Sequence, residues 1–592
     1  MRLVFVSRER SVFSKARSGF RCLATVVTAF IVFATVTSAQ VGRGWSDWLT
    51  PYADAQRTSW LRTDPNISVE AMSKPGFDLQ WTAKLDNEPR GRAGLTQGVT
   101  ASGVTLFVPT SLIAGSSNTL HMLDNDTGYV VWSRTFERLS PASADACSGG
   151  VTAAPTRIVS GAAAPTPPPG ASASLTARGN QQGYRSLLGE PGQGIPVEPR
   201  GGGPGRAAGA ARQGGAPAGS GGPARGEIDR IPGAPNVAGG GLGRAMVGYA
   251  VAADGQLHVV GLQTGKDLQK PAPFLPANAR WSNLVAVGTM MYAATTGNCG
   301  GAPNAVYAID LDAADKPVVS YRTNGGGLVG SVAFSSDGTT LLAAIGPGAI
   351  TGDGKANAII ALDPKTLRLK DWFTQPNAEF VTGPTVFRYG AKDIVAAATK
   401  DGRVILLDVA SLGGTSHGTP LSISRSLVAS GGSIAAEALS TWARAAMATP
   451  TTGAAETRWI LVPVAGRPAG VRETNGPIRN GAVVALRVAD AQGRPSIEPE
   501  WTSGDLAMPA TPITVNGVVF ALSTGRPMIA GRAGAPAVLY AYDGSSGKAM
   551  WNSGTSMTTF ASPGSYWSAL SQVYIGASDG TVYAFGFADD RH

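Results

Sequence analysis

The sequence is poor in the motifs that usually carry metal, redox or hydrolytic chemistry. Its 592 residues include only three cysteines, and only 15% of them are charged. Neither Cys147 nor Cys299 lies in a CxxC or CxxCH context, so zinc binding and covalent haem attachment have no support. The chain also lacks the HExxH motif of zinc hydrolases and the phosphate-binding loop motif. The motif search therefore predicts no catalytic residue and no metal site.

The residues that are abundant indicate a β-rich globular protein. Hydrophobic residues make up 43% of the chain, which is enough for a large core. The 78 glycines and 40 prolines favour turns over long helices. A low content of charged residues is also typical of many short, buried strands.

The N-terminus predicts export. Residues 1–39 combine several arginines with the apolar run CLATVVTAFIVFATV (22–36) and small residues before Gln40. This is the pattern of a secretory signal peptide cleaved near Ala39–Gln40. The alternative is an N-terminal membrane anchor, for which the apolar run is short. We expect a periplasmic or secreted protein that does not span the membrane after cleavage.

Residues 161–243 form a segment rich in Gly, Pro, Ala and Arg. It contains no Trp or Phe and almost no β-branched residues. Such a composition cannot bury enough apolar surface to offset the entropy cost of ordering, so we predict a disordered insertion. Its basic character alone resembles nucleic-acid-binding tails, but export argues against a nucleic-acid partner.

One short pattern recurs along the rest of the chain. Eight similar strand ends alternate apolar residues: LHMLD, LHVVG, VYAID, IIALD, VILLD, VVALR, LYAYD and VYAFG, which end at 124, 261, 310, 363, 408, 487, 543 and 586. Five of the seven spacings are 43 to 56 residues, and the first is longer by the length of the insertion. A repeat of about fifty residues with this alternation predicts one four-stranded unit per repeat, hence a β-propeller.

The pattern predicts eight blades. The last strand end has no outer strand after it, and LQWTAKL (79–85) would supply one and close the ring. Seven blades are the alternative, because the spacing from 408 to 487 is long. Asp-Gly pairs such as Asp254–Gly255 lie between alternating runs, which predicts tight type I′ hairpins between the second and third strands.

A second feature is a turn that leads from the third to the fourth strand of a blade. LDNDTGYVVW (123–132) and AYDGSSGKAMW (541–551) both place an Asp eight positions before a Trp, with a Gly midway. We interpret these residues as structural, with Asp and Gly shaping the turn and Trp covering the gap between blades. The predicted docking residues are Trp81, Asp124, Gly128, Trp132, Asp363, Trp372, Asp543, Gly547 and Trp551.

These turns resemble the tryptophan-docking repeats of the pyrroloquinoline-quinone (PQQ) family, the quinoprotein alcohol dehydrogenase-like eight-bladed propellers. The resemblance covers roughly residues 45–586 apart from the insertion, with 40–75 as a lead-in segment and 76–592 as the propeller. One branch of that family consists of PQQ- and calcium-dependent dehydrogenases, and another of cofactor-free scaffolds. The adjacent Cys-Cys pair, the calcium ligands and the catalytic Asp of the first branch have no match in this sequence.

The functional expectation follows from that mismatch. We expect a non-catalytic binding or scaffold protein of the cell envelope, which presents one propeller face to a protein or envelope partner and needs no cofactor. The alternative is a PQQ- and Ca²⁺-dependent dehydrogenase of alcohols or sugars with degenerate motifs. His121 and His258 are expected to be ordinary strand residues, and His417 a loop residue.

The two cysteines of the mature chain are a candidate disulfide. Cys147 should begin the innermost strand of the second blade, and Cys299 should lie in the loop after the second strand of the next blade. These two classes of loop open on the same face of a propeller. In an oxidising compartment the sequence therefore predicts a Cys147–Cys299 bond.

Overall fold

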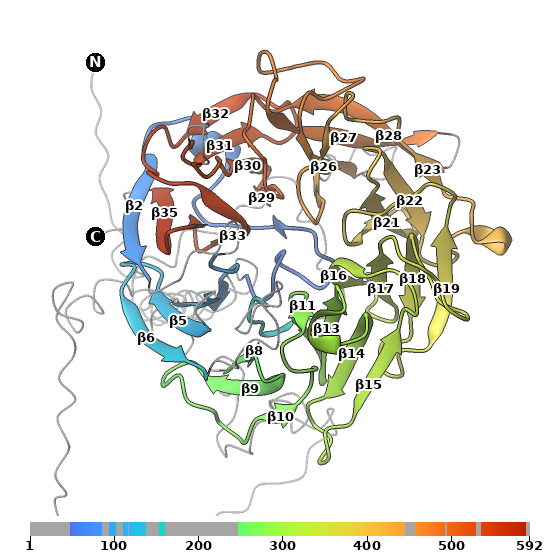
Figure 1. The fold of residues 1–592 in the computed structure, drawn as a ribbon. Helices are drawn as coiled ribbons and strands as arrows, with labels where there is room; N and C mark the ends of the chain where they lie inside the picture. The colour runs from blue at the N-terminus through green and yellow to red at the C-terminus, as the bar shows by residue number, and fades with distance from the viewer. Residues whose placement is uncertain are drawn as a thin grey trace, which may run out of the picture.

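The computed structural model describes residues 48–85, 94–101, 110–115, 118–137, 153–159, 247–444, 456–491, 494–528 and 534–587. The predicted signal peptide, the predicted insertion and Cys147 lie outside these ranges. Within them the strands form eight sheets arranged around one axis (Figure 1). The predicted eight-bladed all-β propeller is thus confirmed, and the seven-bladed alternative is wrong.

Four of the eight blades contain four strands that run in chain order from the axis to the rim. Blade 1 consists of β3 (Val99–Ala101), β4 (Thr110–Ala114), β5 (Thr119–Asp124) and β6 (Val130–Thr135). Blade 4 consists of β16 (Leu328–Phe334), β17 (Leu341–Ile345), β18 (Ala358–Leu362) and β19 (Leu369–Thr374). Blade 5 consists of β20 (Thr385–Tyr389), β21 (Lys392–Ala398), β22 (Val404–Asp408) and β23 (Ser422–Ile423). Blade 7 consists of β29 (Ile513–Val515), β30 (Val518–Ser523), β31 (Val538–Asp543) and β32 (Ala549–Asn552).

Three blades depart from this pattern. Blade 2 has β8 (Val247–Val251), β9 (Gln256–Gly261) and β10 (Ala272–Pro273), with Thr156 bridged to Tyr249 on the inner side. Blade 3 has β12 (Val285–Val287), β13 (Met290–Thr296), β14 (Ala305–Asp310) and β15 (Val318–Arg322), joined by β7 (Ile158–Val159) and β11 (Arg280–Trp281). Blade 6 has β24 (Ser433–Ile434), β25 (Ser440–Arg444), β26 (Thr457–Ala465), β27 (Gly481–Ala491) and β28 (Arg494–Thr502).

The last blade closes the ring with strands from both ends of the chain. It contains β33 (Ala561–Ala569), β34 (Gln572–Ala577) and β35 (Thr581–Phe587), and its outer strand is β2 (Phe77–Lys84). β2 is antiparallel to β35, with Phe77 opposite Phe587 and Trp81 opposite Ala584. The predicted closure is confirmed, and it covers the edge of β35 that would otherwise lack a strand partner.

The Asp-Gly turns differ from the prediction in their backbone type. A type I′ turn needs positive φ at both central residues, but only the glycines have it, at +78° for Gly255 and +85° for Gly580. The aspartates instead accept hydrogen bonds two residues further on, from Gln256 N to Asp254 Oδ1 (2.9 Å) and from Thr581 N to Asp579 Oδ1 (3.0 Å). The type I′ prediction is therefore wrong, because the Asp side chain stabilises a different turn.

Residues 48–64 lie in the middle of the ring (Figure 1) and pass around its axis, contacting the blades in sequence order. Their carbonyl groups accept hydrogen bonds from inner residues of six blades. The donor and acceptor pairs are Thr100 N to Trp48 O, Arg157 N to Leu49 O, Phe334 N to Ala55 O, Val386 N to Gln56 O, Thr441 N to Thr58 O and Thr514 N to Ser59 O, all 2.8–3.0 Å.

Side chains of the same segment reach the two remaining blades. Thr50 Oγ1 donates to Leu284 O of blade 3 (3.3 Å). Asp64 accepts from the N–H and the hydroxyl of Ser571 in blade 8, both at 2.8 Å. Next to it, β1 (Trp60–Leu61) pairs in parallel with β29. We call residues 48–64 the axial segment, and it ties all eight blades together.

Helices are few and short in the described ranges. They are α2 (Val69–Met72), η3 (Cys299–Gly301) and η4 (Gly414–Ser416). Ser68 caps α2, its side chain accepting from Ala71 N at 3.1 Å. None of the helices in these ranges is long and apolar enough to cross a membrane.

The hydrogen bonds between Asp64 of the axial segment and blade 8 can be tested by mutation. The Asp64 carboxylate is buried and also accepts hydrogen bonds from Asn66 N and Ile67 N. Asp64→Ala would leave several buried donors unpaired, so we expect the free energy of unfolding to fall by roughly 3 kcal/mol. Urea denaturation measures this, with Asp78→Ala, an exposed position on β2, as the control. Equal stability of the two variants would contradict the tie between Asp64 and blade 8.

Candidate functional sites at the blade junctions and on the ring axis

The two best-matched docking turns have the same geometry. Asp124 Oδ1 accepts from Asp126 N (2.8 Å) and Thr127 N (3.2 Å), and Asp543 Oδ1 accepts from Ser545 N (2.9 Å) and Ser546 N (2.8 Å). Gly128 and Gly547 follow with φ of +73° and +71°, a conformation that suits glycine. In both turns the carboxylate is engaged by the backbone of its own turn.

Three tryptophans lie flat on a glycine of the neighbouring blade. A Cβ added to Gly128 would come within 2.5 Å of the Trp81 ring, one at Gly547 within 2.6 Å of Trp501, and one at Gly265 within 2.8 Å of Trp132. In each pair the indole N–H donates to a backbone carbonyl, at Asn125 (2.9 Å), Gly544 (3.0 Å) and Leu262 (2.8 Å) respectively. The contact thus requires an indole, a glycine and one carbonyl.

The other two predicted tryptophans pack differently. Trp372 stacks on His417, with ring centroids 3.7 Å apart and planes 16° apart. His417 Nδ1 lies 2.9 Å from Asp371 Oδ1 and 3.1 Å from Trp372 O. Trp551 packs edge-on against two phenylalanines, with its ring centroid 4.9 Å from that of Phe77 and 5.7 Å from that of Phe585. It contacts Phe77 because β2 takes the place of the usual turn in the last blade.

Asp363 belongs to a turn without glycine. Its Oδ1 accepts from the N–H and the hydroxyl of Thr366 (both 2.8 Å) and from Lys365 N (3.1 Å). These hydrogen bonds lower the pKa of Asp363 below its ordinary value. Leu367 takes the left-handed position with φ of +52°. This carboxylate is also engaged by its own turn.

Cys299 begins η3, in the loop between β13 and β14, as the repeat predicts. Because Cys147 lies outside the described residues, the Cys147–Cys299 disulfide stays a prediction.

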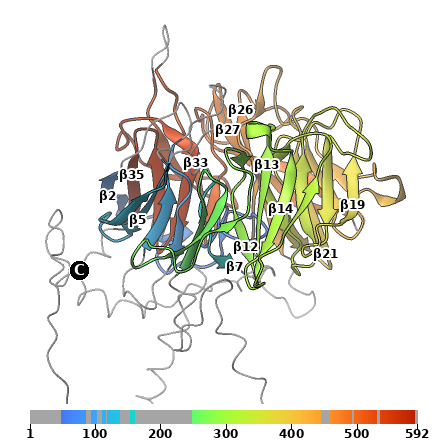
Figure 2. The same ribbon diagram turned by 60° about the horizontal axis from the view of Figure 1, so that its bottom comes forward.

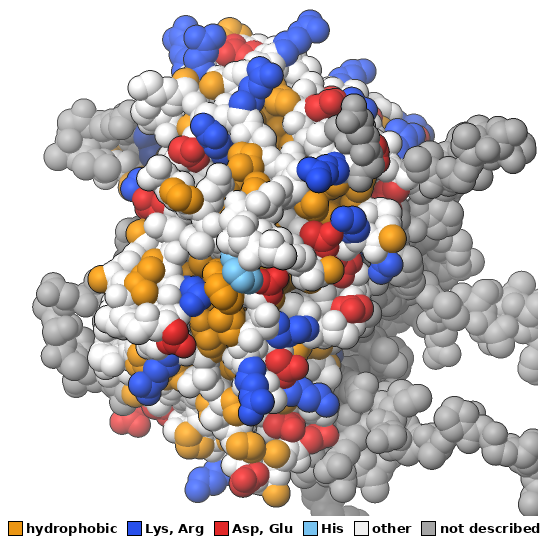
Figure 3. All heavy atoms as spheres, turned by 90° about the vertical axis from the view of Figure 1, so that its right-hand side faces the viewer, with side chains coloured by type: hydrophobic (Ala, Val, Ile, Leu, Met, Phe, Trp, Pro, Cys, Tyr) orange, Lys and Arg blue, Asp and Glu red, His pale blue; other side chains and the backbone are white. Residues whose placement is uncertain are grey.

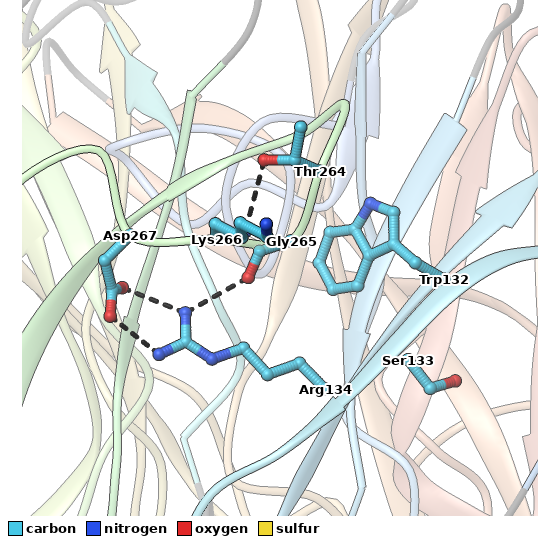
Figure 4. A pocket seen from close by; sticks show the side chains of 7 residues that line it. All are labelled: Trp132, Ser133, Arg134, Thr264, Gly265, Lys266 and Asp267. Carbon is cyan, nitrogen blue, oxygen red and sulfur yellow. Dashed lines mark hydrogen bonds and ion pairs between the residues drawn. The ribbon is translucent and has the colours of Figure 1, made fainter. Parts of the chain in front are cut away.

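Blades 1 and 2 share a charged cluster that sequence reasoning missed (Figure 4). Arg134 of β6 forms two parallel hydrogen bonds with Asp267, at 2.9 and 2.7 Å, and a third with Gly265 O at 3.1 Å. Asp267 also lies 3.1 Å from Nδ1 of His258, and the Arg134 guanidinium stacks 4.5 Å from the centre of Phe136. His258 is therefore not an isolated strand residue.

The pKa shifts in this cluster agree with its geometry. Burial lowers the pKa of His258, although Asp267 opposes the shift. Burial alone would raise the pKa of Asp267, but Arg134 and His258 bring it below its ordinary value. At neutral pH the cluster therefore holds an ionised Arg134–Asp267 pair beside a neutral imidazole. A groove of about 410 Å³ lies over it, bounded by β6 and the turn 264–267.

The axial segment holds most of its charged groups inside the protein. Asp54 accepts from Thr58 N (3.0 Å) and Thr58 Oγ1 (2.6 Å) and pairs with Arg62 at 3.1 Å. Arg57 is 1% exposed and donates to Val332 O (2.8 Å), and burial lowers its pKa to about 10. Arg62 stacks over Trp60, 4.5 Å from the ring centre.

These axial groups do not fit a quinone–calcium centre. The carboxylates of Asp54 and Asp64 are saturated by hydrogen bonds and an ion pair within the protein. Among the residues that the structure describes, no three His, Cys, Asp or Glu side chains are placed to share one metal ion. Calcium prefers six or more oxygen ligands, several of them carboxylates, and the axis offers no such set there.

Comparison with solved structures identifies the type of propeller. A europium-containing methanol dehydrogenase matches with a TM-score of 0.51 at 11% identity, over 93% of this chain and 99% of that chain. The chain therefore shares the propeller fold of this dehydrogenase. This confirms, at the level of fold, the resemblance seen in the sequence.

Other matches are weaker. A quinohemoprotein alcohol dehydrogenase from Comamonas testosteroni has a TM-score of 0.49 at 13% identity, over 93% of this chain and 82% of that chain. BamB from Moraxella catarrhalis has a TM-score of 0.34 at 15% identity, over 59% and 82%. No family model and no curated protein sequence matches the chain.

The docking geometry yields a test with an internal control. Gly547→Ala would place a Cβ against Trp501 at a positive φ, so we expect a loss of about 2–4 kcal/mol of unfolding free energy. Gly554→Ala has a similar φ of +55° but open space around the Cβ, so it reports backbone strain alone, about 1 kcal/mol. Thermal and urea unfolding of both variants would measure the difference, and equal losses would refute a role for the Trp501 contact.

Proposed function

We propose that this protein is an exported, non-catalytic binding or scaffold protein of the cell envelope. It is directed to the periplasm or the exterior by residues 1–39 and is stabilised there by a Cys147–Cys299 disulfide. One face of the ring binds a protein or envelope partner. Neither nucleic acid nor a resident cofactor takes part.

The observation that carries this proposal is the chemistry of the axis. Asp54 and Asp64 are the acidic residues of the axial segment. Asp54 is engaged by Thr58 and Arg62 of the same segment, and Asp64 is engaged by Ser571 of blade 8. A dehydrogenase needs carboxylates free to bind calcium and to accept a proton from the substrate. The axial segment offers neither, so its role is structural.

The loops that join the second and third strands of each blade favour one ring face as the surface that binds the partner. By topology they share one face, and Figure 2 shows loops rising above the disc on that side. Two of the most exposed large apolar side chains lie in these loops, Ile350 (56%) and Met528 (84%). The flank seen in Figure 3 carries interspersed acidic and basic side chains without a dominant charge. We assign the partner to the ring face with these loops because it carries both of these exposed apolar side chains.

The alternative function is a PQQ- and Ca²⁺-dependent dehydrogenase of alcohols or sugars. It is favoured by the fold likeness to methanol dehydrogenase over nearly the whole chain. Fold likeness alone does not carry an activity, because propellers host many unrelated functions.

Reconstitution separates the two functions. The purified protein would be incubated with PQQ and Ca²⁺, desalted, and assayed by quinone absorption and by dye reduction with alcohols and sugars. We expect no retained quinone and no turnover. Retained quinone with substrate-dependent dye reduction would establish the dehydrogenase instead.

A crosslinking experiment tests the binding face directly. A photoreactive amino acid would replace Met528 or Ile350 in cells, and Val318, 41% exposed on the outer strand β15, as the control. We expect a discrete crosslinked partner from the first two positions and none from the third. Adducts from Val318 alone would contradict the assignment of the face.

A further inference from the structure

The charged cluster between blades 1 and 2 exceeds what blade docking requires. Trp81 docks on Gly128 with Ala83 and Val130 at the positions that correspond to Arg134 and Asp267. Trp501 docks on Gly547 with Ser503 and Ala549 at those positions. Two junctions thus form the same tryptophan–glycine contact without any ion pair. Arg134 and Asp267 are additions to the motif, and they call for a separate role.

The added side chains are held in a fixed arrangement. Arg134 is clamped by both oxygens of Asp267, by Gly265 O and by the ring of Phe136. Asp267 is fixed in turn by His258, which is 6% exposed. Side chains locked in this way lose little conformational entropy when a ligand binds.

The groove above the cluster has the size and polarity of a small-molecule site. Its volume of about 410 Å³ falls in the range of ligand pockets, and an indole, two hydroxyl groups and charged groups line it. Arg134 and Asp267 neutralise each other. The ammonium of Lys266 is exposed and has no ion-pair partner among the residues described, so the groove carries one net positive charge.

We propose that this groove binds a small hydroxyl-bearing molecule with one anionic group, a carboxylate or a phosphate. Lys266 pairs with the anionic group, because it is the one lining charge that is not neutralised. The hydroxyl of Thr264 offers a donor and an acceptor to a hydroxyl group of the ligand, and the Arg134–Asp267 pair, fixed by its own hydrogen bonds, forms a polar wall of the groove. This site is on the rim of the ring, separate from the binding face proposed above.

Titration with defined probes tests the site. The protein would be labelled with 5-fluorotryptophan, and the ¹⁹F resonance of Trp132 assigned with Trp132→Phe. Titrants are D-glucuronate, inorganic phosphate and neutral D-glucose. We expect a saturable shift of that resonance with glucuronate or phosphate, and the probe that binds identifies the anion. No saturable shift with either, or an equal shift with glucose, would overturn the proposal.

Matched variants locate the binding. Lys266→Ala should weaken the affinity about tenfold, since it removes one hydrogen bond to a charged group. Lys548→Ala is the control, because Lys548 has the corresponding position in the docking turn of blade 7. Both lysines are exposed, so neither variant should alter the unfolding transition. Equal affinities of wild type and Lys266→Ala would also overturn the proposal.

Discussion

The carbonyl groups of the axial segment are the acceptors on which the ring depends. The inner strands of a propeller converge on the axis and leave backbone donors there without a strand partner. Residues 48–59 satisfy these donors in turn, from Thr100 of blade 1 to Thr514 of blade 7. Asp64 then reaches blade 8, and β2 pairs with β35 to close the ring. One N-terminal stretch therefore completes both the centre and the rim.

This path around the axis requires an unusual backbone. Tyr52, Ala53, Arg57 and Ser59 all have positive φ, between +52° and +75°, although none is glycine. Such conformations cost of order 1–3 kcal/mol each and persist only where the surroundings fix them. Here the surroundings are the blades themselves. All four residues are buried, Tyr52 N donates to Gln97 of blade 1, and the carbonyls of Gln56, Thr58 and Ser59 accept from inner strands. The strain is thus a consequence of following the ring.

The sequence predicts the features that repeat and misses those that do not. Strand ends at regular spacing establish the eight blades, and LQWTAKL places the closing strand, because periodicity and turn chemistry are local. The pairing of Trp372 with His417 is not local, since it joins residues of different blades across 45 positions. Arg134 and Asp267 are 133 positions apart, and neither stands out in its own repeat. The axial segment escapes prediction for the same reason, because its partners span the whole chain.

The central claim is that the axial segment is an integral part of the folded ring. Hydrogen exchange of the intact protein, followed residue by residue, tests it most directly. The account predicts that the amides of Val386, Thr441 and Thr514, which donate to the segment, exchange only on global unfolding, together with the β34–β35 amides. Exchange of these three amides well before the blade cores would show that the segment detaches from a ring that stands without it, and would contradict the account.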